Sequence, residues 1–316
     1  MTNKRDHGGG LDAAMAQFGG TRDHWLDLST GINPIPYPIG DIPMDSWTRL
    51  PDQDGDNTLI NAARKFWHVP NGANILASSG VSQIIAMLPQ IASGANFQIA
   101  KPTYNEHEAA FVHAGFTLNN SAPVKIYVHP NNPDGKTHVI DDNTLKNADL
   151  IIIDESFCDI CPSESLVKFA TRPNVIILKG LGKFWGLAGL RLGFAIGHPA
   201  NIQKLRNLIG PWAVSGPAQY IGARALDDTD WITKTRKRLQ TDAFRLDKIA
   251  IASGLGIIGG TDLFRLYKTN DAVSFQKHLA QNYIWSRIFP YSSEWIRLGL
   301  PGQPDHWAQI ESALGA

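Results

Sequence analysis

Residues 175–197 read VIILKGLGKFWGLAGLRLGFAIG, two apolar runs joined by a glycine-rich connection. The run at 175–178 is typical of a buried strand, and a second apolar strand follows the connection. Lys183 is flanked by Phe184 and Trp185, so its amine is expected to be desolvated. Desolvation lowers the pKa of a lysine and makes the neutral amine available as a nucleophile. Taken alone, Lys183 is also compatible with an ordinary surface charge.

The composition is that of an ordinary globular chain. Its 316 residues, 43% hydrophobic and 18% charged, suffice for a large α/β domain and a smaller one. The 29 basic residues equal the 29 acidic residues, so no charge excess indicates nucleic-acid binding. No apolar run approaches the ~20 residues that cross a membrane, and the first ten residues lack the apolar segment of a signal peptide. We therefore expect a cytoplasmic protein.

Two cysteines, Cys158 and Cys161, are too few for a disulfide framework. Their C-x-x-C spacing also occurs in redox and metal sites. No second Cys or His pair stands at a suitable spacing, and the pair directly follows a predicted strand. A structural role and no metal site are therefore predicted.

Two segments near the start suggest binding loops. Residues 25–38, WLDLSTGINPIPYP, contain prolines at 34, 36 and 38 that exclude regular helix and strand. The length of this loop favours a functional role over a plain connector. Further on, Ser79, Gly80, Val81 and Ser82 are expected to form the first turn of a helix. The free N–H groups of such a turn bind anions, although simple helix capping is the alternative.

Three predicted strands end in polar or aromatic residues. Tyr104 follows the first, at the edge where ligands collect in doubly wound sheets. Asn132 lies in the turn NNPDG after the second. The run ADLIIID is too apolar for a half-exposed strand, so we expect a central parallel strand ending at Asp154. A carboxylate there needs a cationic or hydrogen-bonding partner. Alternatively, Tyr104 is a core aromatic residue, Asn132 is part of a plain turn, and Asp154 caps the next helix.

The predicted secondary structure changes in the C-terminal third of the chain. Residues 199–253 are predicted to be mainly helical, and strand-like pieces follow that contain Arg287 and Arg297. An arginine on a strand is usually an exposed charge. The other interpretation is anion binding, because a guanidinium pairs bidentately with carboxylates.

Together these motifs resemble, in kind and order, the fold-type I pyridoxal-phosphate (PLP) enzymes of the class I and II aminotransferase superfamily. They are LDLSTGINP, the turn at 79–82, PTY, NNPDG, DESF, the lysine loop, RLG and RLGLP. The resemblance implies an α/β fold, with a mainly parallel seven-stranded sheet flanked by helices in a large domain and a smaller α/β domain. It further implies a homodimer. The implied domains are an N-terminal substrate segment (1–45), the PLP-binding domain (46–208) and the small domain (209–316).

The resemblance also implies roles for individual residues. Lys183 would bond the cofactor aldehyde, Asp154 would pair with its pyridine nitrogen, and Tyr104 would stack on its ring. The other implied cofactor contacts are Gly80, Val81, Ser82, Asn132 and Arg191. The implied substrate contacts are His7, Gly31, Asn33, Arg287 and Arg297.

Some features are similar to one branch of this superfamily, the threonine-phosphate decarboxylases of cobalamin biosynthesis. They are HGG at 7–9, Phe157 in place of a tyrosine, and WIRLGLPG at 295–302. This similarity implies decarboxylation of a small phosphorylated amino acid, L-threonine O-3-phosphate, to (R)-1-aminopropan-2-yl phosphate. The alternatives are an aminotransferase of the histidinol-phosphate type and a non-catalytic PLP-fold protein.

Four positions depart from the broader family pattern. Phe157 lacks a tyrosine hydroxyl, and Gly180 and Gly182 stand where a serine or threonine often helps bind the phosphate. Leu50 replaces a tyrosine that reaches the cofactor phosphate across the dimer. Losing about three neutral hydrogen bonds, at ~0.5–1.5 kcal/mol each, should weaken PLP binding without preventing it.

Overall fold

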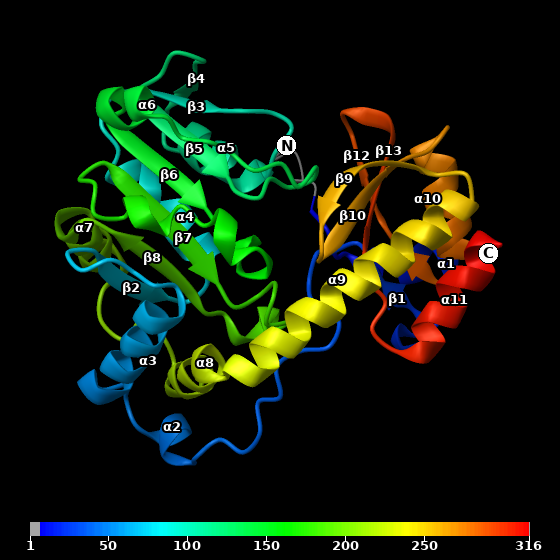
Figure 1. Cartoon of the computed structure of the whole chain (residues 1–316), viewed down its shortest axis with the longest axis horizontal. Coiled ribbons are helices and arrows are strands. Elements are labelled where there is room, and N and C mark those ends of the chain that lie inside the picture. The colour runs from blue at the N-terminus through cyan, green and yellow to red at the C-terminus, as the bar shows by residue number, and fades with distance from the viewer. Residues whose placement is uncertain (1–6, 316) are drawn as a thin grey trace. The chain divides into compact units, whose positions relative to one another are not determined.

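The computed structural model describes residues 7–315 and divides into two compact units (Figure 1). The large unit comprises Tyr37–Asn132 and Thr137–Ile232. The small unit comprises Met1–Pro36, Pro133–Lys136 and Thr233–Ala316. Each unit is built around a β-sheet of its own.

The large unit contains a seven-stranded sheet in the order β2-β8-β7-β6-β5-β3-β4. Its strands are β2 (Asn74–Ser78), β3 (Asn96–Ile99), β4 (Thr117–Leu118), β5 (Val124–Val128), β6 (Leu150–Asp154), β7 (Val175–Gly180) and β8 (Gly193–Gly197). β8 runs antiparallel to both of its neighbours, and every other pairing is parallel. The predicted α/β fold with a mainly parallel seven-stranded sheet is confirmed.

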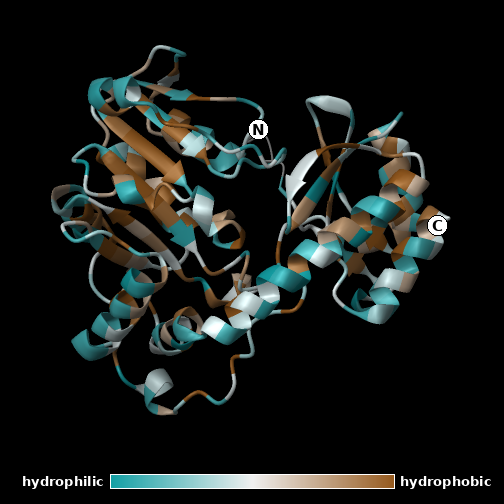
Figure 2. Cartoon of the chain, in the orientation of Figure 1, coloured by the Kyte–Doolittle hydropathy of each residue, from teal (hydrophilic) through white to brown (hydrophobic). Residues whose placement is uncertain are grey.

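The central strands β6 and β7 are buried along their whole length, as the apolar runs at 150–153 and 175–178 predict. Helices cover the sheet: α3 (Gln53–Phe66), α4 (Val81–Met87), α5 (Asn105–His113), α6 (Asp142–Asn147), α7 (Pro199–Ile209) and α8 (Gly216–Asp227), with the short α2 (Asp45–Thr48) nearby in sequence. One core cluster joins apolar residues of β5, β6 and β7 with α4, α5 and α7. Figure 2 shows these strands in hydrophobic colours and α3 largely in hydrophilic ones.

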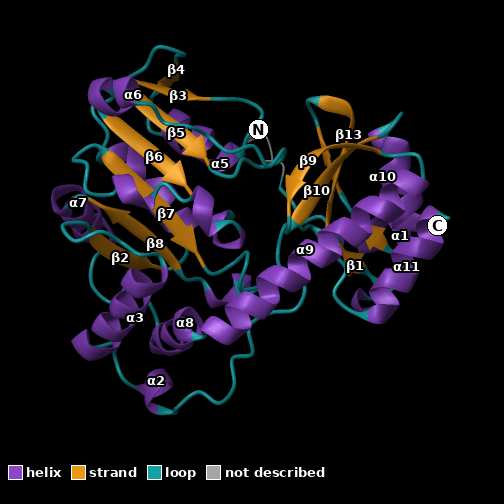
Figure 3. Cartoon of the chain, viewed as in Figure 1, coloured by secondary structure: helices purple, strands orange, loops and turns teal. Residues whose placement is uncertain are grey.

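The small unit contains a four-stranded antiparallel sheet in the order β12-β13-β10-β9 (Figure 3). Its strands are β9 (Gly256–Thr261), β10 (Phe264–Lys268), β12 (Arg287–Phe289) and β13 (Ser292–Gly299). A two-stranded parallel pair joins β1 (Leu26–Asp27) to β11 (Ile284–Trp285). The helices are α1 (Leu11–Phe18), α10 (Ala272–Gln281) and α11 (Pro304–Leu314), together with most of α9 (Thr229–Ala252). The predicted smaller α/β unit is confirmed.

Several single turns of 3-10 helix complete the chain. They are η1 (Arg22–His24), η2 (Leu88–Gln90), η3 (Cys158–Ile160), η4 (Pro162–Glu164), η5 (Val167–Phe169) and η6 (Ala188–Leu190). Across residues 7–315, none of the helices has the length and apolar content that crossing a membrane requires.

Candidate active site

A cavity of about 240 Å³ lies at the carboxyl edge of the parallel strands in the large unit. It is lined by the ends of β5, β6 and β7, where doubly wound sheets bind ligands. The structure brings together there all the residues predicted to contact the cofactor: Gly80, Val81, Ser82, Tyr104, Asn132, Asp154, Lys183 and Arg191. Phe157, Gly180 and Gly182, which depart from the family pattern, line the same cavity.

The loop between β7 and β8 supplies both Lys183 and Arg191. The Lys183 ammonium lies 5.2 Å from the centre of the Phe157 ring. Trp185 is fully buried and anchors the loop by donating its indole N–H to Asp159 at 3.2 Å. Arg191 adopts the left-handed conformation, with φ of 53°, which is uncommon outside glycine and concentrates at functional sites.

The start of α4 forms the anion-binding end of the cavity. The helix begins at Val81, after Gly80 with φ of +89°. This positive φ favours glycine, and a Cβ on Gly80 would lie 2.6 Å from Arg191 Nη2, so a side chain here would displace the guanidinium from the helix N-terminus. Gly193 in β8 is similarly tight, because its Cβ would lie 2.3 Å from the Val81 nitrogen. The free backbone N–H groups at the start of α4 and the guanidinium of Arg191 therefore lie together at one wall of the cavity.

Ser79 differs from its predicted place in the first helical turn. It precedes the helix, and its hydroxyl donates to the Ala213 carbonyl at 2.5 Å. Its backbone N–H donates to the Gln83 side chain at 3.1 Å. The hydroxyl available to the cavity from this segment is that of Ser82.

Asp154 lies at the end of β6 and is almost completely buried. His107 Nε2 lies 2.8 Å from Asp154 Oδ2, and the Ser156 hydroxyl and N–H donate to Oδ1. Burial alone would raise the pKa of Asp154, but the hydrogen bond and charge of His107, with the Ser156 bonds, outweigh it. The pKa of Asp154 is therefore lowered, and the carboxylate stays ionised in the core.

His107 was not predicted from the sequence. It follows Tyr104 by three residues on α5, and residues at that spacing share a helix face. The two rings meet edge to face at 6.1 Å between centroids. A histidine one helical turn after the aromatic residue was the available signal, but its partner lies 47 residues away along the chain.

Replacing His107 by leucine should raise the Asp154 pKa, because burial then dominates. A carboxylate with a lowered pKa adds stability above its unfolded pKa and loses it as pH falls through the folded value. In H107L a folded pKa raised above the unfolded value reverses this sign, so the less satisfied carboxylate should cost about 1–3 kcal/mol at neutral pH and less as pH falls through the unfolded pKa. Urea unfolding across pH measures the difference in stability from the unmodified chain. S156A, which keeps His107, should lose less stability at neutral pH, and a deficit in H107L that does not shrink toward low pH would contradict the prediction.

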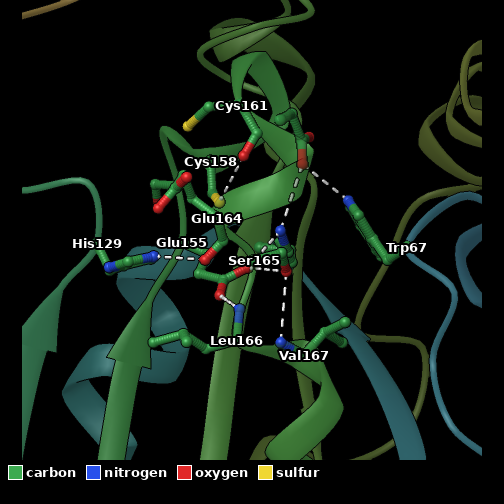
Figure 4. A network of polar contacts seen from close by, with 12 residues as sticks. Trp67, His129, Glu155, Cys158, Cys161, Glu164, Ser165, Leu166 and Val167 are labelled. Atoms are coloured by element: carbon green, nitrogen blue, oxygen red, sulfur yellow. Dashed lines mark hydrogen bonds and ion pairs between the residues drawn. The ribbon is translucent and has the colours of Figure 1, made fainter. Parts of the chain in front are cut away.

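A buried charge network surrounds Glu155 (Figure 4). Lys179 on β7 lies 2.6 Å from Glu155 and 3.5 Å from Asp159, and all three side chains are almost inaccessible. Glu155 also accepts from the Ser165 hydroxyl and the Leu166 N–H. These contacts tie β7 to the turn after β6.

The residues predicted to bind substrate belong to the small unit. Arg287 and Arg297 stand directly opposite each other on β12 and β13. Arg287 donates to the His7 carbonyl at 2.6 Å, and Arg297 to the Ser29 carbonyl at 2.7 Å. Burial, and then the charge of Arg287, lower the pKa of Arg297 to about 10. Opposed like charges are unfavourable, so this pair suits a bound anion.

Asn33 has a different neighbourhood within the small unit. Its side-chain oxygen accepts from Arg238 at 2.6 Å and from the Ile35 N–H at 3.1 Å. A guanidinium can only donate, so this contact fixes which way the amide points. Gly31 is buried in the same loop.

Comparisons with known proteins are consistent across sequence and structure. The family model described as aminotransferase class I and II matches residues 42–125 and 124–309. A threonine-phosphate decarboxylase from a Sinorhizobium species is 36% identical over 311 residues, covering 93% of this chain and 92% of the relative. One from Pseudomonas aeruginosa is 33% identical, covering 98% and 97%. The crystal structure of histidinol-phosphate aminotransferase from Sinorhizobium meliloti in complex with pyridoxal 5′-phosphate superposes with a TM-score of 0.79. It is 18% identical, covering 97% of this chain and 93% of that one.

Proposed function

The chain belongs to the class I and II aminotransferase family, whose members bind pyridoxal 5′-phosphate, and on that basis we propose that it is a PLP-dependent decarboxylase of L-threonine O-3-phosphate. The products would be (R)-1-aminopropan-2-yl phosphate and carbon dioxide. The observation that carries the proposal is the identity of 33–36% to threonine-phosphate decarboxylases over nearly the full length of both chains.

The groups lining the cavity fit PLP part by part. The Lys183 amine suits an aldehyde, the ionised Asp154 a protonated ring nitrogen, and Asn132 a phenolic oxygen. Tyr104 offers an aromatic face. Arg191 and the start of α4, which lie close together at Gly80, suit a phosphate. When bound, PLP would supply an electron sink for the bond broken at the substrate Cα.

Each protein group has a defined task in this proposal. Asp154, held ionised by His107 and Ser156, would keep a proton on the ring nitrogen of the cofactor. Lys183 would release the cofactor to the incoming amino acid and later deliver a proton to Cα. Arg287 and Arg297 would bind the anionic groups of the substrate. Such anchoring decides which bond at Cα breaks, because that bond must stand perpendicular to the ring.

Carbon dioxide release from L-threonine O-3-phosphate, in the presence of PLP, tests the proposal directly. We expect release of one carbon dioxide for each substrate consumed, with the cofactor recovered unchanged. No release would overturn decarboxylation. Conversion of the cofactor to its amine form during a single turnover would instead favour an aminotransferase of the histidinol-phosphate type.

Gly182 and Gly180 provide a test of the cofactor site alone. A Cβ on Gly182 would meet its nearest neighbour, Ala188 Cα, at 3.4 Å, an ordinary contact. We expect G182S to add a hydroxyl to the cavity and tighten PLP binding by ~0.5–1.5 kcal/mol, roughly 2–10-fold. A Cβ on Gly180 would lie 2.8 Å from Val81 Cγ2, so G180S should weaken binding. Titration with PLP by absorbance measures both. Equal affinities in the two variants would show that neither position faces the cofactor.

A further inference from the structure

The C-x-x-C pair, Cys158 and Cys161, lies on a turn directly after a residue that lines the cavity. Phe157, which lines the cavity, is followed directly by η3 (Cys158–Ile160). Both cysteines are free thiols, Cys158 buried and Cys161 half-buried. Figure 4 shows both side chains on this turn, beside Glu155 and Glu164.

The backbone holds the two cysteines at a spacing that suits a disulfide. The Cys161 N–H donates to the Cys158 carbonyl at 2.9 Å. A turn closed by this bond keeps its end Cα atoms within about 7 Å, and disulfides form at Cα separations of about 4.4–6.8 Å. Cys161 directly follows η3 and caps its C-terminal end. The Cys158 thiol already points to this end of the turn, because it donates to the Cys161 carbonyl at 3.7 Å.

The surroundings give the two thiols different chemistry. A hydrogen bond from Cys158 lowers the pKa of Cys161, burial opposes this, and the nearby Lys179 ammonium lowers the pKa further against Glu164 and Glu155. The bond to Cys161 and then burial raise the pKa of Cys158. Cys161, the more exposed thiol, is therefore the nucleophile, and Cys158 is positioned to attack it afterwards.

A metal ion is the competing use of this cluster, and the contacts disfavour it. Ligand atoms of His129, Glu155 and Cys158 lie within 4.8 Å of one another. Both His129 ring nitrogens are already engaged, however: Nδ1 accepts the His138 N–H at 2.9 Å, and Nε2 donates to the Glu164 carbonyl at 2.8 Å. Glu155 is engaged by Lys179. Disulfide formation between Cys158 and Cys161, in contrast, does not require the hydrogen bonds of His129 or the ion pair of Glu155 to break.

Asp159, one of the two residues between the cysteines, links the turn to the Lys183 loop. Asp159 accepts the indole N–H of Trp67 at 2.9 Å and that of Trp185 at 3.2 Å. Trp185 follows Lys183 by two residues. Asp159 therefore connects the turn to the Lys183 loop through Trp185.

We propose that Cys158 and Cys161 form a reversible dithiol–disulfide site whose state is transmitted to the Lys183 loop through Asp159 and Trp185. With a peroxide, the Cys161 thiolate attacks one oxygen, the O–O bond breaks, and hydroxide leaves. The Cys158 sulfur then attacks the oxidised Cys161 sulfur, the S–S bond forms, and water leaves. Two thiols lose two hydrogen atoms while the peroxide becomes two waters. A dithiol restores both thiols by exchange.

Because the chain has only two cysteines, intact mass and thiol alkylation report on this site alone. The full chain is treated with hydrogen peroxide under native conditions and then alkylated. We expect the loss of two hydrogen atoms, no alkyl adduct, and full reversal by dithiothreitol. Tryptophan emission should shift between the two states, because Trp67 and Trp185 both donate to Asp159.

Two single variants separate the roles of the thiols. C158S retains the nucleophile and should alkylate faster than C161S, and neither should lose two hydrogen atoms. Two alkylated thiols after oxidation of the unmodified chain, or a disulfide between two chains, would overturn the proposal. So would unchanged tryptophan emission upon disulfide formation, or faster alkylation of C161S. None of these measurements depends on PLP or on decarboxylation.

Discussion

Lys183→Ala should abolish the visible absorption that PLP acquires when bonded to a lysine, and should lower turnover at least about 10²–10⁴-fold. That range is the usual contribution of a positioned acid–base group alone, before the loss of the covalent bond is considered. Lys183 is the lysine that lines the cavity, above the Phe157 ring. Spectra of the purified variant with PLP, together with carbon dioxide release, measure both effects.

A matched control uses the same substitution on an exposed lysine in the last turn of α6. Lys146→Ala should leave the absorption band and turnover unchanged. A band that persists in K183A would assign the bond to another lysine. If the unmodified chain shows no band at saturating PLP, the non-catalytic alternative gains support.

Lys179→Met should destabilise the protein by about 3–5 kcal/mol, the usual cost of removing one partner of a buried ion pair. Lys179 lies 2.6 Å from Glu155 and 3.5 Å from Asp159, so the variant leaves two buried carboxylates without their cation. Burial would lower the pKa of Lys179, but Glu155 and then Asp159 outweigh it, so its pKa is raised. Urea unfolding monitored by fluorescence measures the loss, provided that the slope with urea is unchanged.

The same substitution on a surface ion pair isolates the effect of burial. Lys65 lies 2.8 Å from Asp227, and both side chains are more than half exposed. K65M should therefore cost at most about 1 kcal/mol. A raised lysine pKa contributes its full stability below the unfolded pKa of about 10.4 and loses it above the folded value. The gap between K179M and the unmodified chain should thus stay constant through neutral pH. Equal losses in K179M and K65M would contradict the argument.

The sequence predicted the parts of the site that local patterns specify. Apolar runs mark β6 and β7. Asp154, the last residue of β6, and Lys183, in the loop after β7, line the cavity because parallel strands end at one edge. The order of the motifs, rather than any one of them, indicated the family. What each of these residues does in the reaction stays a prediction.

The partners of these residues could not be predicted in the same way. His107 reaches Asp154 across 47 residues, and Arg238 reaches Asn33 across 205. Such contacts depend on how separate elements pack, and no short pattern in the chain records them. Lys179 continues the apolar strand β7, and nothing along the sequence pairs it with Glu155 on the neighbouring strand turn.

The reversed direction of β8 has a consequence for how the cavity assembles. Gly180 at the end of β7 pairs with Gly193 at the start of β8, so Lys183 and Arg191 share one short loop. The contact between Asp154 and His107, in contrast, closes a loop between residues 47 positions apart in the chain. Loop-closure entropy makes that longer closure more costly by ~1 kcal/mol. The part of the cavity that contains Lys183 and Arg191 is thus local in the chain, and during folding it can form before Asp154 and His107 meet.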